Sequence, residues 1–152
     1  MSIRANQSKL SRALALSTGS IRLYVRNEDY QNGFTARSLV NLLSKGGETK
    51  EGFNLPARPV LKQFFENNQV EIMGLIKRIH PWMFKGYKAK EAYQELASKL
   101  LTMFRAWVAL GGVTPSNAAY TQKVKGFDAP FYRTGNLLQF FDTEVKVDTT
   151  NK

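Results

Sequence analysis

Two apolar stripes at helical spacing constrain the fold of this chain more than any other feature. Apolar residues recur every three or four positions across residues 59–79 and again across residues 89–107. A period of 3.6 residues places such a stripe on one face of an amphipathic helix. His80-Pro81 is expected to end the first helix, and Gly111-Gly112 the second. We therefore predict a long helical hairpin whose two apolar faces pack together.

Alternating segments flank this hairpin on both sides in the sequence. Residues 20–26 alternate apolar and polar side chains and are rich in β-formers, and residues 137–147 form a second alternating segment. The alternation fails at Leu138 and Phe140, where a bulge or burial on both faces is expected. These segments predict an α+β fold in which an antiparallel β-sheet packs against the helical hairpin, with short additional helices.

Two threonines predict the starts of the short helices. Thr35 is a candidate N-cap for a helix that ends at Gly46-Gly47, because its hydroxyl can accept a hydrogen bond from the first turn. Thr114-Pro115 predicts a second start, since proline suits the first turn of a helix. This second helix is expected to close near Gly126.

The length and composition are those of one domain. A chain of 152 residues with 43% hydrophobic residues can build one sizeable core. We predict a basic N-terminal arm at residues 1–19, a single α+β domain at residues 20–147 and a flexible tail at residues 148–152.

The absence of cysteine excludes disulfides and thiolate-bound zinc. No apolar block has signal-peptide or membrane-spanning length, so synthesis and retention in a cytoplasm are expected.

The net charge of +10 is concentrated toward the N-terminus. Residues 1–62 carry ten Lys and Arg against four Asp and Glu, whereas residues 111–152 carry five against four. Such an excess attracts either nucleic acid or an acidic protein surface. A basic DNA-binding protein that uses residues 1–62 is therefore retained as an alternative function.

Two groups of residues resemble catalytic or metal sites. His80 is the only histidine, and capping the carbonyls at the end of its helix explains it better than a proton relay does. Asp128 followed by Glu144-Val145-Lys146 matches the carboxylates and lysine of many metal-dependent nucleases. The solvated face of an alternating strand explains Glu144 and Lys146 better, because three-residue motifs recur by accident. We therefore predict no enzyme, no cofactor and no metal, with the nuclease as the least favoured alternative.

Arg58 has an unusual position at the start of the first long helix. The partly positive N-terminal end of a helix disfavours a cation, so Arg58 is expected to bond an acceptor outside its own helix. Pro59 suits the first turn, and Pro56 holds the residue before it in extended geometry. The segment therefore presents Arg58 in a fixed direction.

A loop before the final alternating segment is a second candidate for partner contact. Thr134-Gly135 directly precedes that segment, and glycine permits a turn with positive φ. Phe131, Tyr132 and Arg133 place large side chains in the loop, where such groups commonly contact a partner.

The same two regions carry a family resemblance. Residues 35–46, then 54–61 (Asn-Leu-Pro-Ala-Arg-Pro-Val-Leu), then 121–125 (Thr-Gln-Lys-Val-Lys) and 130–137 (Pro-Phe-Tyr-Arg-Thr-Gly-Asn-Leu) share their order and spacing with one family. The chain resembles the neck, tail-completion and virion-morphogenesis proteins of tailed bacteriophages over about residues 20–147. It departs from the family pattern at Val60, where an aromatic residue is usual, and at residues 131–133, which replace Leu, apolar and Asp positions.

The resemblance implies a structural virion protein that forms a homo-oligomeric ring of six or twelve copies at the neck or tail junction. It would be a neck, tail-completion or tail-terminator subunit, located in the virion and assembled in the host cytoplasm. Its implied partners are other copies of itself, head–tail connector and portal-side proteins, and tail tube or sheath proteins. Genomic double-stranded DNA would pass through the channel without sequence-specific binding, and no membrane is involved. The interface residues that it suggests are Pro56, Arg58, Pro59, Phe131, Tyr132, Arg133, Thr134 and Gly135.

Overall fold

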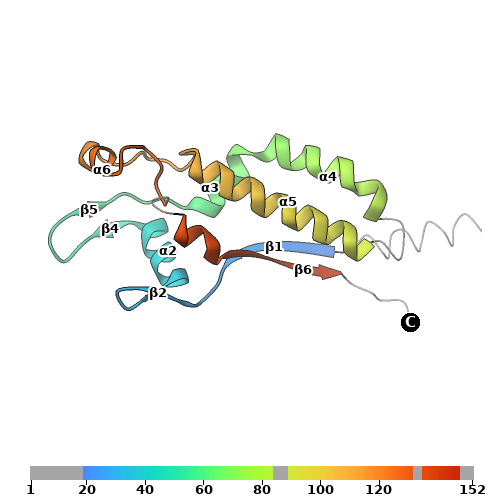
Figure 1. Cartoon of the computed structure of the whole chain (residues 1–152), viewed down its shortest axis with the longest axis horizontal. Helices are drawn as coiled ribbons and strands as arrows, with labels where there is room; N and C mark the ends of the chain where they lie inside the picture. Colours follow the sequence, from blue (N-terminus) through green and yellow to red (C-terminus); the bar gives the residue numbers. More distant parts are fainter. Residues whose placement is uncertain (1–18, 84–88, 132–134, 148–152) are drawn as a thin grey trace, which may run out of the picture. The chain divides into compact units, whose positions relative to one another are not determined.

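The computed structural model describes residues 19–83, 89–131 and 135–147, and these residues have an α+β fold (Figure 1). In chain order the elements are β1 (Gly19–Val25), β2 (Asp29–Gln31), β3 (Phe34–Thr35), α2 (Ala36–Lys45), β4 (Gly47–Glu48), β5 (Asn54–Leu55), α3 (Val60–Asn67), α4 (Gln69–Met83), α5 (Ala89–Ala109), α6 (Ala119–Lys125), the 3₁₀ helix η2 (Asn136–Phe140) and β6 (Phe141–Val147). The predicted basic arm and flexible tail lie outside the described residues, apart from Gly19 at the start of β1. No helix in the described part of the chain is long and apolar enough to cross a membrane.

The strands form three small antiparallel sheets. β1 pairs with β6, so the prediction that residues 20–26 and the last alternating segment share a sheet is confirmed (Figure 1). The pairing continues one step beyond β6, where the N–H of Arg26 donates to the Phe140 carbonyl at 2.8 Å. β2 and β3 form one hairpin, and β4 and β5 form another in which Glu48 lies opposite Asn54.

The final strand is shorter than predicted, because residues 136–140 form η2 instead of the start of a strand. Leu137 and Leu138 are both buried, and successive residues of a strand point to opposite faces. A turn of 3₁₀ helix buries both leucines on one side. The failed alternation at Leu138 and Phe140 was therefore the signal of a helical turn and not of a bulge.

The first predicted long helix is two helices, α3 and α4, separated at Asn68. The Phe64 carbonyl accepts both the backbone N–H of Asn68 at 3.0 Å and its side-chain Nδ2 at 2.8 Å, which closes α3. The predicted break at His80-Pro81 is wrong, since α4 continues through Pro81 to Met83. His80 and Pro81 are exposed, so water can solvate the carbonyl that proline leaves without a donor.

The described residues belong to two compact units. Unit 1 contains residues 19–22, 70–83, 89–100 and 143–147, and unit 2 contains residues 23–69, 101–131 and 135–142. In unit 1, α4 packs against the first half of α5 as the predicted hairpin. Its core is Ile79, Ala92, Tyr93 and Leu96, with Ile21, Leu75, Ile76, Val145 and Val147 packed around it.

Unit 2 is built around a cluster of aromatic rings in edge-on and tilted contact. Phe64 of α3, Phe104 of α5 and Phe141 of β6 are fully buried. The ring of Phe104 lies edge-on to Phe64 at 5.2 Å and tilted against Phe141 at 4.7 Å, centroid to centroid. Trp107 of α5 adds a fourth ring at 5.6 Å from Phe64. Burial of large aromatic side chains is the main source of stability in such a core.

The predicted cap of α2 is confirmed and can be tested by substitution. Thr35 Oγ1 accepts a hydrogen bond from the N–H of Ser38 at 3.2 Å, and α2 ends at Gly46 as predicted. Thr35→Ala is expected to lower the free energy of unfolding by about 1 kcal/mol, because that N–H loses its acceptor. Thr35→Ser keeps the hydroxyl and is the control. Equal unfolding midpoints in urea for the two variants would show that the cap contributes nothing.

Candidate interface

Arg58 lies between α2 and α3 and is fixed there by its backbone. Its N–H donates to the carbonyl of Leu43 at 3.0 Å, near the end of α2. Gly46, with φ 65°, allows this approach, since a Cβ there would overlap the backbone of Leu55 and Ala57. Pro59 is the N-cap residue of α3, so the predicted position of Arg58 at the mouth of a helix is confirmed.

The Arg58 guanidinium bonds two carbonyls far away in the sequence. Nε donates to the Pro115 carbonyl at 2.7 Å and Nη2 donates to the Ser116 carbonyl at 2.8 Å. The expectation of an acceptor outside its own helix is confirmed. These are charge-assisted bonds made by a planar two-pronged group, which fixes direction as well as distance.

Gln63 of α3 holds the residue just before this pair of carbonyls. Its side-chain Nε2 donates to the Thr114 carbonyl at 2.7 Å, while its Oε1 accepts the Thr114 N–H at 2.9 Å. The side-chain amide of Gln63 thus both donates to and accepts from the backbone of Thr114, as a residue on a neighbouring β-strand would. Gln63 was not predicted as a functional residue, because nothing in the sequence distinguishes it from other polar residues on a helix face.

Asp128 and Gln122 hold the other end of the same loop. Asp128 Oδ1 accepts the N–H of Asn117 at 2.9 Å, and Gln122 Nε2 donates to the Asn117 carbonyl at 2.7 Å. Four side chains therefore bond backbone groups of residues 114–117, which we call the clamped loop. The predicted helix start at Thr114-Pro115 is therefore wrong. The backbone groups of this loop bond side chains instead of one another, and α6 begins only at Ala119.

The Arg58 guanidinium remains a charged donor to the clamped loop at all physiological pH values. Partial burial lowers the pKa of Arg58, and the nearby Asp128 carboxylate acts in the opposite direction and raises it. Arginine starts from so high a pKa that the guanidinium stays protonated. The two bonds to the clamped loop are consequently not expected to depend on pH near neutrality.

Two further arginines, which no sequence pattern distinguishes, hold η2. Arg105 of α5 donates from Nε to the Leu138 carbonyl at 3.2 Å and from Nη2 to the Phe141 carbonyl at 2.9 Å. Arg26 Nη2 donates to the Gln139 carbonyl at 2.8 Å. Carbonyls at the end of a short helix lack intrahelical partners, and these guanidinium groups supply them.

The loop that precedes η2 is only partly described. Gly135 has φ 79°, which confirms the predicted positive-φ turn, although the turn leads into η2 and not directly into a strand. Phe131 is half-buried and also has positive φ, at 66°. Pro56 is exposed. Tyr132, Arg133 and Thr134 lie outside the described residues.

The residues of the nuclease alternative have other partners. Asp128 accepts from the clamped loop, as described above. On β6, Lys146 Nζ lies 3.8 Å from Glu144 Oε1, with 69% of the lysine side chain exposed. Among residues 19–83, 89–131 and 135–147, no group of three or more His, Asp or Glu side chains is placed to hold a metal ion.

Comparison with known proteins gives no further guide to this site. The chain matches no protein-family model, no curated protein and no solved structure at a significant level.

Proposed function

We propose that this chain is a structural subunit of a tailed-phage virion, a neck, tail-completion or tail-terminator protein that forms a ring of six or twelve copies between head and tail. The observation that carries the proposal is the use of Arg58. The arginine of the family-like segment 54–61 is engaged by two backbone carbonyls and organises a surface loop. Arg58 therefore orders a surface loop, a role that suits a protein whose surface contacts a partner.

A second observation supports the proposal. The family-like segments 35–46, 54–61, 121–125 and 130–137 all belong to unit 2. Segments 54–61 and 121–125 supply Arg58 and Gln122 to the clamped loop. Two of the four segments that resemble the family in sequence therefore also cooperate in one structural feature. In the proposed ring, this feature would face a neighbouring virion protein, and genomic DNA would pass through the axial channel.

The proposal is tested by removing the protein from particle assembly. Interruption of its coding sequence in the phage that carries it should leave separate DNA-filled heads and tails in the lysate. Addition of the purified full-length protein to that lysate should join heads to tails and restore infectivity. Electron micrographs that show joined particles without the protein would contradict the proposal.

The DNA-binding alternative draws on the net charge of +10 and has a distinct signature. If phosphate contacts were the function, affinity for double-stranded DNA would fall steeply between about 50 and 200 mM salt from a high starting value. The structural proposal expects only weak binding at low salt and none at physiological salt. Fluorescence anisotropy with a labelled duplex separates the two.

The nuclease alternative is tested with plasmid DNA. We expect no cleavage in the presence of Mg²⁺ or Mn²⁺, because Glu144 pairs with Lys146 and Asp128 serves the clamped loop. Metal-dependent cleavage that disappears in Glu144→Ala would reject the structural role. The same assay with Glu95→Ala, a carboxylate paired with Lys99 on α5, is the control for a general effect of charge.

A further inference from the structure

Helix α6 carries an apolar stripe that the described chain leaves uncovered. None of its residues is buried. Tyr120 is 78% exposed, Val124 61% and Phe127, just beyond the helix, 39%. Tyr120 and Val124 have the i, i+4 spacing of an apolar helix face that normally faces a core, and Phe127 follows just after the helix ends. We call them, together with the exposed Lys123 between them, the α6 patch.

The α6 patch is held in place although Tyr120 and Val124 are largely exposed. A helix of seven residues has little stability of its own, so other contacts must fix it. Gln122 ties the helix to the clamped loop through the Asn117 carbonyl, and Gly126 ends it with φ 81°. Lys125 Nζ donates to the Ala129 carbonyl at 3.2 Å and lies 5.6 Å from the centre of the Phe127 ring. The patch is thus pre-organised for binding, which lowers the entropic cost of association.

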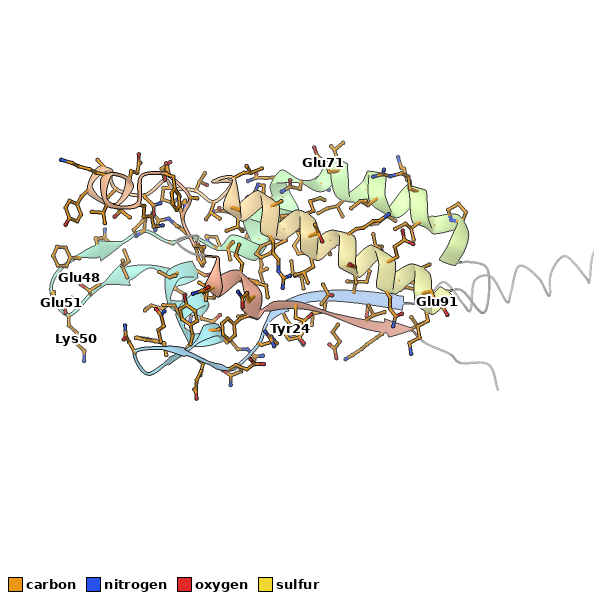
Figure 2. All side chains as sticks on the ribbon, in the orientation of Figure 1. Tyr24, Glu48, Lys50, Glu51, Glu71 and Glu91 are labelled. Carbon is orange, nitrogen blue, oxygen red and sulfur yellow. The ribbon has the colours of Figure 1, made fainter. Side chains whose placement is uncertain are left out.

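The connection between β4 and β5 presents a complementary surface. Phe53 is 69% exposed, more than any other phenylalanine among the described residues. The turn is ordered by Thr49, whose N–H donates to the Phe53 carbonyl at 2.8 Å and whose hydroxyl accepts the Phe53 N–H at 3.1 Å. Figure 2 shows Glu48, Lys50 and Glu51 grouped on this connection. We call residues 48–53 the hairpin tip.

We propose that the hairpin tip of one copy binds the α6 patch of the next copy. Phe53 would cover Tyr120 and Val124, and Glu48 and Glu51 would face Lys123. Charge complementarity favours a second copy as the occupant, because α6 carries two lysines and no acidic residue whereas the tip carries two glutamates and one lysine. The ring closure rests on the proposed function, but the contact between copies does not.

The symmetry of this contact follows from its two different surfaces. A contact between unlike surfaces is heterologous, so two copies joined by one contact still have one free tip and one free patch between them. Such a contact continues from copy to copy and closes into a ring when the rotation between neighbours permits. A self-complementary contact would stop at a dimer.

The experiment uses the full-length protein and two surface variants, Phe53→Asp and Tyr120→Asp. Analytical ultracentrifugation should show that the parent assembles beyond a dimer and that each variant alone is weakened at least about tenfold in self-association. A mixture of the two variants should give a one-to-one heterodimer and nothing larger. In that mixture Tyr120→Asp supplies the intact tip and Phe53→Asp supplies the intact patch, so each pair of copies can form only one contact. Circular dichroism should show both variants folded like the parent.

The control is Val70→Asp, which places the same charge on an apolar residue that is 81% exposed on α4. It should assemble like the parent. A parent that stays monomeric at high concentration would overturn the contact, as would rings formed equally well by Phe53→Asp and Tyr120→Asp. In either case, joining of heads to tails by the parent would still support the proposed function, so the two failures are distinguishable.

Discussion

Phe104→Ala is expected to lower the free energy of unfolding by about 3–5 kcal/mol, the largest effect of any substitution considered for this chain. The side chain is fully buried and its ring contacts those of Phe64 and Phe141. Truncation removes both ring contacts and leaves a cavity that three different elements would have to collapse to fill. Trp107→Ala should cost less, because Trp107 is only half-buried.

Urea unfolding monitored by circular dichroism measures this effect. Phe65→Ala is the matched control, since Phe65 also contacts the Phe64 ring, at 5.3 Å, but is 40% exposed. Its loss should stay near or below about 1 kcal/mol. If Phe104→Ala unfolds within roughly 0.5 kcal/mol of the parent, the aromatic core of unit 2 is wrongly assigned.

Arg58→Ala is expected to lower the free energy of unfolding by about 1.5–3 kcal/mol, the range for hydrogen bonds that involve a charged group. The carbonyls of Pro115 and Ser116 lose their donors. Both residues are exposed, so water replaces part of the loss and the value should fall toward the lower end. The loss of order in the clamped loop should also weaken assembly, because that loop holds α6 through Gln122.

Arg58→Lys distinguishes the geometry of the guanidinium from its charge. An ammonium group cannot reproduce two parallel bonds to successive carbonyls, so little rescue is expected. Thermal unfolding and head-to-tail joining should be measured for both variants beside the parent, and Lys62→Ala, an exposed cation on α3, is the control. Parent-like behaviour of Arg58→Ala would reduce Arg58 to an ordinary surface side chain.

The local features of this protein could be predicted from its amino-acid sequence. Helical periodicity revealed the segments of α4 and α5, alternation revealed β1 and most of β6, and Thr35 marked the start of α2. The unfavourable position of Arg58 correctly indicated an acceptor outside its helix. Each of these results depends on chemistry within a window of a few residues, such as capping, periodicity or the helix dipole, which is visible in the sequence alone.

Contacts between distant residues could not be predicted from the sequence and became visible only in the folded chain. The acceptors of Arg58 are 57 and 58 positions away, and the role of Gln63 depends on a loop 51 positions away. Packing also turned residues 136–140 into a 3₁₀ helix and left the apolar stripe of α6 exposed. A stripe at helical spacing shows only that one face is apolar. Whether the chain's own core covers that face depends on how distant segments fold together, which no local rule contains.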